Sequence, residues 1–181
     1  SVLANYIKKI GYSVYQGSEK DVLLRYYEAA IANKADVVVR ITGDCPLIDP
    51  KIIDKAISVF FEKKVDYVSN TILSTYPSGM DVEVLAFQVL EKIHKKSNQN
   101  RQREHVTPYI REEIKSEFKK ENLSSQINLP KMRLTLDEPV DFKVIDSIFK
   151  YFHPNKNFTL EDIVNLNKIK PEIFQQNMHL M

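Results

Sequence analysis

Hydrophobic side chains recur along this chain with two periods, one typical of helices and the other of strands. Apolar residues spaced three and four apart predict helices over residues 3–10, 22–33, 50–63, 87–96, 106–118 and 140–151, and two further helices open at Thr159 and Pro171. Shorter β-branched or alternating runs predict extended segments over residues 12–15, 37–41, 65–70, 82–85 and 131–136. Because helices and strands alternate, we expect an α/β fold with a mainly parallel sheet.

The strand expected over residues 37–41 is followed by a candidate ligand, Asp44. Gly43 allows a tight turn and Pro46 prevents the strand from continuing, so Asp44 lies at the carboxyl end of the strand. Ligands of parallel α/β sheets bind at that end. A carboxylate there is a natural ligand for Mg²⁺, which prefers oxygen atoms and keeps waters and phosphates as its other ligands. The alternative is that Asp44 caps the helix that starts near Asp49, and the residues alone leave both open.

A second acid, Asp137, follows the strand expected over residues 131–136 and precedes Pro139. Two acids at two strand ends of one sheet can converge on one cation although they are far apart in sequence. Capping of the next helix explains Asp137 as well, and it is compatible with metal binding because a carboxylate has several acceptor positions.

The composition is that of an ordinary globular domain and argues against several classes of protein. The chain has 181 residues, 43% hydrophobic and 28% charged, which fits a single domain over residues 1–181. The net charge of +2 gives no argument for a nucleic-acid surface. No apolar run approaches the roughly 20 residues of a membrane span, and no signal pattern opens the chain. Cys45 is the only cysteine, so we expect no internal disulfide and a reducing, cytoplasmic location.

Five ordered motifs then suggest a family. They read Gly17-Ser18-Glu19-x-Asp21-Val22-Leu23, Arg40-Ile-Thr-Gly-Asp-Cys-Pro-Leu-Ile-Asp49-Pro50, Gly79-x-Asp81-Val82-Glu83, Arg103-Glu104-His105-Val-Thr-Pro108-Tyr109 and Leu134-Thr-Leu-Asp137-Glu-Pro139-x-Asp141. Together they resemble the SpsF-like cytidylyltransferases of spore-coat polysaccharide biosynthesis, which are relatives of the CMP-sugar synthetases for 3-deoxy-manno-octulosonate and N-acylneuraminate. Five motifs in order are far more specific than one glycine signature.

The resemblance implies a fold, a reaction and a metal ion. The fold is the nucleotide-diphospho-sugar transferase fold, a Rossmann-like three-layer sandwich with a mainly parallel sheet. In the reaction, a hydroxyl of an acidic sugar attacks the α-phosphate of CTP, pyrophosphate leaves and a CMP-sugar forms. By position, Asp44 and Asp137 match the family's Mg²⁺ ligands. The resemblance also implies a homodimer, although the sequence offers no apolar patch that we can assign to the interface.

Eight other residues fall within the matching motifs. We expect Ser18, Arg40, Thr42 and Gly43 to bind the nucleotide, and Asp81, Glu83, Arg103 and His105 to bind the sugar. Six of them have a structural alternative: Ser18 can cap a helix, Arg40 can form an internal salt bridge, and the charged groups of Asp81, Glu83, Arg103 and His105 can lie on the surface.

One part of the family pattern is missing. The Arg/Gly-rich loop with a Pro-Gly-Lys-like end, which cradles the triphosphate, has no match here, and residues 1–10 resemble the helix after the second strand of the fold. We therefore expect a domain that lacks its N-terminal βα region. A glycosyltransferase on the same fold and a non-catalytic nucleotide-binding partner domain are the alternative functions.

Overall fold

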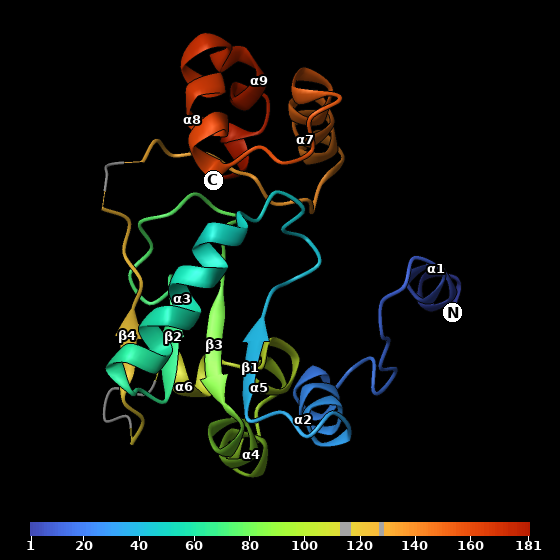
Figure 1. The fold of residues 1–181 in the computed structure, drawn as a ribbon, viewed down its shortest axis with the longest axis vertical. Helices are drawn as coiled ribbons and strands as arrows, with labels where there is room; N and C mark the ends of the chain where they lie inside the picture. Colours follow the sequence, from blue (N-terminus) through green and yellow to red (C-terminus); the bar gives the residue numbers. More distant parts are fainter. Residues whose placement is uncertain (113–116, 127–128) are drawn as a thin grey trace. The chain divides into compact units, whose positions relative to one another are not determined.

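The chain divides into two units, which are described separately. In this computed structural model, residues 1–112, 117–126 and 129–181 are described. Unit 1 comprises Ser1–Val38 and Leu85–Lys119, and unit 2 comprises Val39–Val84 and Lys120–Met181. The chain passes from one unit to the other within β1 (Val37–Arg40) and again within β3 (Glu83–Ala86). These two strands can be followed in Figure 1.

The described residues form a four-stranded sheet with the strand order β1-β3-β2-β4. Its other two strands, β2 (Tyr67–Ser69) and β4 (Lys120–Asn122), pair in parallel. In Figure 1 the arrows of β1 and β4 point the same way and that of β3 points the opposite way. Among the described strands, β1, β2 and β4 therefore run in one direction, and only β3, which lies between β1 and β2, runs against them. The expected α/β class is confirmed.

Helix α3 (Pro50–Lys63) shows how local signals set an element of unit 2. The carboxylate of Asp49 accepts a hydrogen bond from the amide of Lys51 at 2.9 Å and caps the helix, and proline is favoured at its first position. Ile52, Ala56 and Phe60 are buried along one stripe of α3, which contacts β2. The helix ends at Lys64, which is left-handed with φ 49°. The prediction of a helix over residues 50–63 is confirmed.

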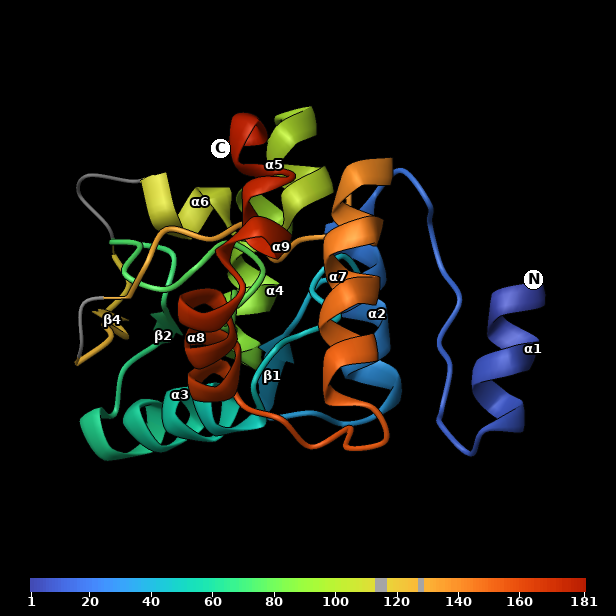
Figure 2. The same cartoon turned by 90° about the horizontal axis from the view of Figure 1, so that it is seen from above.

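The C-terminal part of unit 2 folds into α7 (Pro139–Phe152), α8 (Leu160–Ile169), α9 (Pro171–Gln175) and the 3-10 helix η1 (Met178–Leu180). In Figure 2, α9 lies between α7 and α8, and it contacts both. Ile148 of α7 and Leu166 of α8 are almost completely buried and belong to the apolar core. The second carboxylate oxygen of Asp49 accepts from the amide of Leu160 at 2.8 Å, so one side chain links the start of α3 to the start of α8.

In the described part of unit 1, the regular secondary structure is helical apart from the segments of β1 and β3. Its helices are α1 (Val2–Lys9), α2 (Val22–Ala32), α4 (Phe87–Lys96), α5 (Asn100–His105) and α6 (Pro108–Glu112). Helix α2 packs against α4 and α5, and α5 packs against α6. The prediction for residues 87–96 is confirmed.

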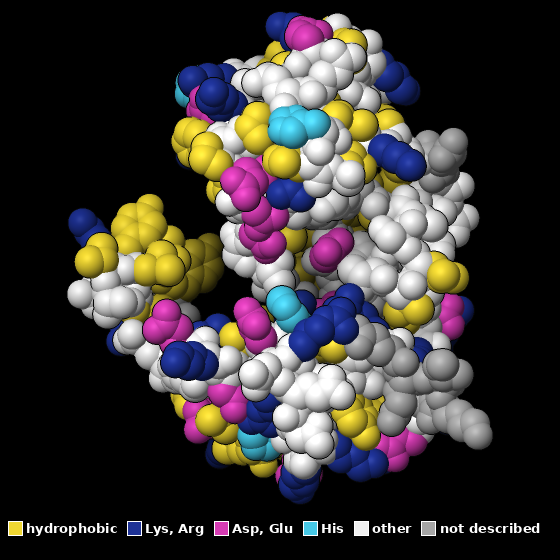
Figure 3. All heavy atoms as spheres, turned by 180° about the vertical axis from the view of Figure 1, so that it is seen from behind, with side chains coloured by type: hydrophobic (Ala, Val, Ile, Leu, Met, Phe, Trp, Pro, Cys, Tyr) yellow, Lys and Arg dark blue, Asp and Glu magenta, His cyan; other side chains and the backbone are white. Residues whose placement is uncertain are grey.

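Helix α1 exposes much of its apolar surface. Val2, Leu3, Tyr6 and Ile10 are all exposed, and hydrophobic side chains dominate this segment at the left of Figure 3. Across the described part of the chain, no helix combines the length and the apolar character needed to cross a membrane.

Two of the predicted strands do not form. Residues 12–15 form no strand, and the amide of Tyr12 instead donates to the carbonyl of Ile7 at the end of α1. Residues 131–136 form only an isolated bridge between Ser78 and Arg133. The ladder does not continue, because the amide of Leu136 donates to the carbonyl of Asp44 instead. Strand β4 was not expected.

The helix predicted over residues 106–118 is also not continuous. Helix α5 begins earlier, at Asn100, and ends before Val106, which has a positive φ of 71°. A β-branched residue in that conformation is strained, and burial of its side chain opposes the strain. Pro108 then starts α6. Residues 113–116 of the predicted helix lie outside the described residues.

Candidate functional site

The turn after β1 carries Asp44 in unit 2. Cys45 is buried beneath this turn, and its thiol lies 3.2 Å from the hydroxyl of Thr42 and 3.7 Å from a carboxylate oxygen of Asp44. Burial raises the pKa of the Cys45 thiol, the Thr42 hydrogen bond lowers it, and the negative charges of Asp44 and Asp81 raise it again, so the net shift is upward. The structure thus brings Asp44 and Asp81 to the same buried thiol.

The conformation at Gly43 differs from the sequence expectation. Its φ lies outside the left-handed region, and a Cβ there would meet no heavy atom of the described residues within 4 Å. The fold of this chain therefore does not itself require glycine at position 43.

A main-chain hydrogen bond joins Asp44 to Leu136, the residue before Asp137, and so relates the two acids predicted to hold Mg²⁺. The carbonyl of Asp44 accepts from the amide of Leu136 at 2.8 Å. Asp137 directly follows Leu136 in the sequence, so its backbone lies close to that of Asp44. The Asp137 side chain is about half exposed, at 49%. Asp44 and Asp137 are therefore neighbours at the level of the backbone, although they are far apart in sequence.

Arg133 holds the carboxylate of Asp137. Its Nη2 donates to Asp137 Oδ2 at 2.9 Å and to Asp141 Oδ2, also at 2.9 Å. Asp141 is fully buried, and its carboxylate also accepts from Asn177 and from the amides of Asp137 and Glu138. Hydrogen bonds from Arg133 lower the pKa of Asp141, burial raises it, and the bonds from Asn177 and the two amides lower it further; the net result is far below the usual range.

Arg40 and Glu83 form an internal ion pair in unit 2. The distance from Arg40 Nη1 to Glu83 Oε2 is 2.5 Å, and Glu83 Oε1 accepts a short hydrogen bond from the hydroxyl of Tyr67. Glu83 and Tyr67 are buried. The Nε of Arg40 is buried and has no hydrogen-bond partner among the described residues. The pair gives both predicted ligands a structural role, and their contacts with substrate stay predictions.

Asp81, unlike Glu83, lines a cavity. The cavity has a volume of about 910 Å³ and lies within unit 2. Its lining is rich in hydroxyl groups and includes one described lysine, and it consists of Thr71, Ser74, Thr75, Tyr76, Pro77, Ser78, Asp81, Ser125, Gln126, Leu129, Pro130, Lys131, Met132, Met178 and Met181. A volume of this size accommodates a small polar ligand.

The predicted residues of unit 1 are engaged in local structure. Arg103 Nε donates to Asp21 Oδ2 at 3.0 Å, and its Nη1 donates to the carbonyl of His94 at 2.8 Å. Burial raises the pKa of Asp21, but hydrogen bonds from Arg103 and the Leu24 amide lower it, with a net decrease. The Asp21 side chain, not Ser18, is the N-cap of α2. The prediction that Ser18 caps this helix is therefore wrong, since its hydroxyl accepts from the Asp21 amide at 2.9 Å.

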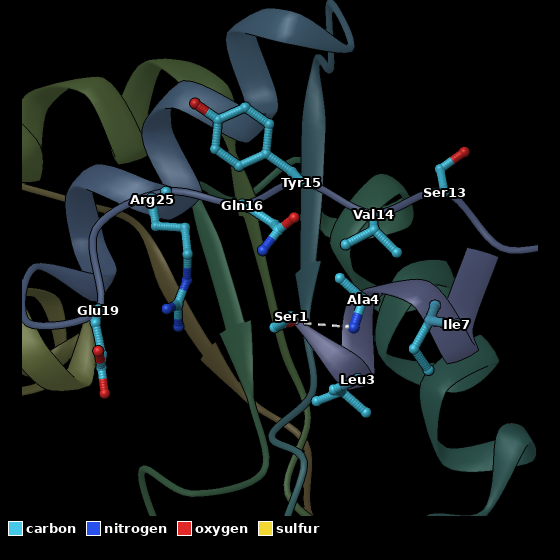
Figure 4. Close-up of a pocket in the computed structure, with 11 residues that line it drawn as sticks. Ser1, Leu3, Ala4, Ile7, Ser13, Val14, Tyr15, Gln16, Glu19 and Arg25 are labelled. Carbon is cyan, nitrogen blue, oxygen red and sulfur yellow. Dashed lines mark hydrogen bonds between the residues drawn. The ribbon is translucent and has the colours of Figure 1, made fainter.

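Ser18 and His105 have different surroundings. The carbonyl of Ser18 accepts from Arg25 at 3.1 Å. Arg25 lines a second cavity, of about 650 Å³, between α1 and the segment before α2. Figure 4 shows that α1 contributes apolar side chains to this cavity, whereas the facing segment contributes polar Gln16 and Glu19. His105 ends α5 and is exposed. Whether Ser18, Arg103 and His105 bind ligands stays a prediction.

Sequence reasoning missed Arg133 and Asn177. A signal for Arg133 was present, because it lies between the buried residues Met132 and Leu134, and a charge in such a run requires an acidic partner. No sequence signal distinguishes Asn177, whose role depends on the fold of the C-terminal helices.

An α/β sheet with an acid in the turn after one of its strands, as Asp44 is after β1, is typical of proteins that bind nucleotides. Comparison with known proteins identifies the family within this class. A family model described as cytidylyltransferase matches residues 2–180. A solved structure of a cytidylyltransferase from Leptospira borgpetersenii serovar Hardjo-bovis superposes with a TM-score of 0.91 and 34% identity, covering 96% of this chain and 73% of that chain.

Two curated proteins are also similar to this chain. An uncharacterized protein of Methanocaldococcus jannaschii is 39% identical over 175 residues, which are 94% of this chain and 69% of the relative. The spore coat polysaccharide biosynthesis protein SpsF of Bacillus subtilis is 28% identical over 174 residues, or 94% of this chain and 71% of SpsF. The chain belongs to the cytidylyltransferase family and is an SpsF-like nucleotidyltransferase. Membership of this family implies a CTP-type nucleotide substrate.

Proposed function

We propose that this chain transfers CMP from CTP to a sugar hydroxyl and releases pyrophosphate, as a step in surface polysaccharide biosynthesis. Family membership supports the type of reaction, and the similarity to SpsF supports the pathway. The observation that carries the proposed site is the hydrogen bond between Asp44 and Leu136, because it keeps Asp44 beside Asp137. A cytoplasmic location and a homodimer stay predictions from the sequence.

Asp44 and Asp137 would together hold a Mg²⁺ ion. Within the described ranges, no group of three or more His, Cys, Asp or Glu side chains could hold a metal. Two carboxylates nevertheless fit Mg²⁺, which binds proteins through one or two carboxylates and takes phosphate oxygens and waters as its remaining ligands. When bound, the ion would offset phosphate charge and polarise the attacking hydroxyl.

The reaction requires positioning more than covalent chemistry by the protein. The sugar oxygen forms a bond with the α-phosphorus, the bond to the bridging oxygen breaks, pyrophosphate leaves and the hydroxyl proton passes to solvent. Such transfers depend on alignment and on stabilisation of charge. We propose that Arg40, Thr42, Gly43 and Ser18 contact the nucleotide. The ion pair with Glu83 would fix the guanidinium of Arg40 for that contact.

The cavity that contains Asp81 is the proposed site for the sugar. The carboxylate of Asp81 would accept hydrogen bonds from sugar hydroxyls, and the lining hydroxyl groups would contribute others. Lys131, on the same lining, would pair with the carboxylate of an acidic sugar. Glu83, Arg103 and His105 are the other proposed sugar contacts, carried over from the family motifs.

Pyrophosphate release tests this proposal. The full chain is incubated with CTP, Mg²⁺ and a panel of acidic and neutral sugars, and we expect release with an acidic sugar that stops when Mg²⁺ is chelated. Asp44→Asn should lower the rate at least ~100-fold, since it removes a metal ligand that acts on the transition state. Asp54→Asn, at an exposed carboxylate on α3, is the matched control and should leave the rate unchanged.

The other outcomes separate the alternatives. No release with any sugar contradicts the proposal. Transfer from a nucleotide-sugar to an acceptor without pyrophosphate identifies a glycosyltransferase, and binding of CTP without turnover identifies a partner domain. Release with neutral sugars alone would contradict only the acidic substrate.

A further inference from the structure

Arg133 lies between a buried acid and an exposed one. Its Nε donates to Asp141 Oδ1 at 3.0 Å, while its Nη2 donates both to Asp141 Oδ2 and to Asp137 Oδ2, each at 2.9 Å. The guanidinium therefore makes two hydrogen bonds to Asp141, one to each carboxylate oxygen, and one hydrogen bond to Asp137. This geometry depends on the planar fork of arginine, which lysine lacks.

The buried end of this arrangement is rigidly anchored. Asp141 has no exposed surface, and it accepts from Asn177 Nδ2 at 2.8 Å and from the amides of Asp137 and Glu138 at 3.1 and 3.0 Å. The backbone beside Arg133 is held as well, since Asn177 Nδ2 donates to the carbonyl of Arg133 at 3.1 Å. Arg133 consequently has little freedom to move away from Asp137.

The exposed end is oriented but not enclosed. The Asp137 side chain is 49% exposed, whereas that of Arg133 is 16% exposed. Arg133 engages one carboxylate oxygen of Asp137, Oδ2, so Oδ1 is the oxygen that this contact leaves for a ligand. Without Arg133, rotation about the side-chain bonds of Asp137 would spread that oxygen over several positions, and ordering it again would cost binding free energy.

We propose that Arg133 is a positioning residue that fixes the Asp137 carboxylate, through Asp141 and Asn177, as a one-oxygen ligand for the divalent ion. This inference rests on the proposed function, in which Asp137 binds Mg²⁺. Partners that orient a metal ligand in this way typically change metal affinity about 10-fold or more when they are removed.

The test measures binding in addition to turnover. CTP is titrated calorimetrically into the full chain at a series of Mg²⁺ concentrations, without sugar, to give the Mg²⁺ concentration at which CTP affinity is half-maximal. Arg133→Lys keeps the positive charge but loses the fork, and we expect it to raise this Mg²⁺ concentration about 10-fold. Lys150→Met, which removes an exposed pair with Asp146, is the control and should leave it unchanged.

A second variant distinguishes an effect on Mg²⁺ binding from a loss of folding. The double variant Arg133→Gln/Asp141→Asn replaces the buried ion pair with two amides, and thermal unfolding verifies that each protein is folded. It should raise the half-maximal Mg²⁺ concentration as Arg133→Lys does. A purely structural Arg133 would lower the thermal midpoint without changing that concentration, and this result would overturn the inference.

Asp137→Asn separates this inference from the proposed function. If Asp137→Asn leaves the Mg²⁺ dependence of CTP binding unchanged, Asp137 is not a metal ligand and the proposed site fails. If Asp137→Asn weakens the dependence but both Arg133 variants do not, the proposed site stands and only the role of Arg133 is overturned.

Discussion

The guanidinium of Arg40 and the carboxylate of Glu83 form an ion pair of 2.5 Å between the neighbouring strands β1 and β3. The side chain of Glu83 is only 3% exposed, and its other oxygen accepts from Tyr67. Removing one member of such a pair leaves a buried charge without compensation, and this costs more than the pair itself contributes.

Glu83→Ala should therefore lower the free energy of unfolding by about 3 kcal/mol. Urea denaturation measures this change, with the midpoint and slope compared to the parent protein. Glu121→Gln is the matched control, because Glu121 forms an exposed pair with Lys63 and should contribute less than about 1 kcal/mol. Similar losses in the two variants would contradict the structural importance of the Arg40 pair.

Elements with local signals were predictable from the sequence, whereas elements defined by pairing were not. Helix α3 has a capping acid, a proline and an apolar stripe within its own residues, and its bounds were predicted correctly. Strand β4 (Lys120–Asn122) has no apolar pattern, because it is a strand only through its pairing with β2. Met132 and Leu134 are buried without a ladder, so the apolar alternation of 131–136 predicts a strand that does not form.

Gly79 is a second position where the structure allows a sharp prediction. It has a φ of +94°, and a Cβ there would lie 2.5 Å from the backbone of Leu134. Gly79→Ala adds this clash to the strain of a positive φ, so we expect a loss of at least ~3 kcal/mol in the free energy of unfolding. Because Ser78 accepts from the Leu134 amide, the variant should also disturb the proposed sugar cavity.

Gly11→Ala provides the control for Gly79→Ala. Gly11 has nearly the same φ, +93°, but a Cβ there would meet nothing within 4 Å among the described residues. Only the conformational cost remains, about 1 kcal/mol. Chemical denaturation of the two variants separates the clash from the strain, and equal losses would show that the approach to Leu134 is unimportant.

Gly43→Ala tests the nucleotide site without disturbing the fold. Since a Cβ at position 43 meets open space and φ is ordinary, the free energy of unfolding should change by less than about 0.5 kcal/mol. If the nucleotide approaches the backbone here, the added methyl group should raise the KM for CTP at least ~10-fold. Unchanged kinetics would mean that Gly43 has no close contact with the nucleotide.

The sequence predicts only part of the candidate site. Asp44 follows β1, as the sequence predicts, whereas the strand predicted before Asp137 does not form, and a hydrogen bond from Leu136 to Asp44 is what keeps Asp137 nearby. The partners of Arg40 and Arg103 could not be foreseen, because they lie 43 and 82 residues away in sequence. Such pairs form only when tertiary structure brings the elements together, so the sequence alone does not distinguish a structural arginine from one that contacts a ligand.

Asp141 makes the stability of the protein dependent on acid pH. Hydrogen bonds from Arg133 lower the pKa of Asp141 most strongly, burial opposes them, and bonds from Asn177 and two amides lower it further, so the folded-state pKa is well below the unfolded-state value. The unfolded chain consequently binds this proton first as the pH falls. The stability that Asp141 contributes is complete above about pH 4 and is lost progressively as the pH falls toward its folded-state pKa.

We therefore expect the free energy of unfolding to decrease with decreasing pH below about pH 4, and to decrease less in Asp141→Asn, which has no charge to titrate at this position. Urea denaturation between about pH 2.5 and pH 7, a range that includes the pKa of Asp in the unfolded chain, gives the slope of the free energy of unfolding against pH for the parent protein and for Asp141→Asn. Asp146→Asn removes a more exposed carboxylate from the same helix and should retain nearly all of the parent slope. If Asp141→Asn and Asp146→Asn showed the same dependence on pH as the parent, the buried contacts of Asp141 would not be the source of the acid sensitivity.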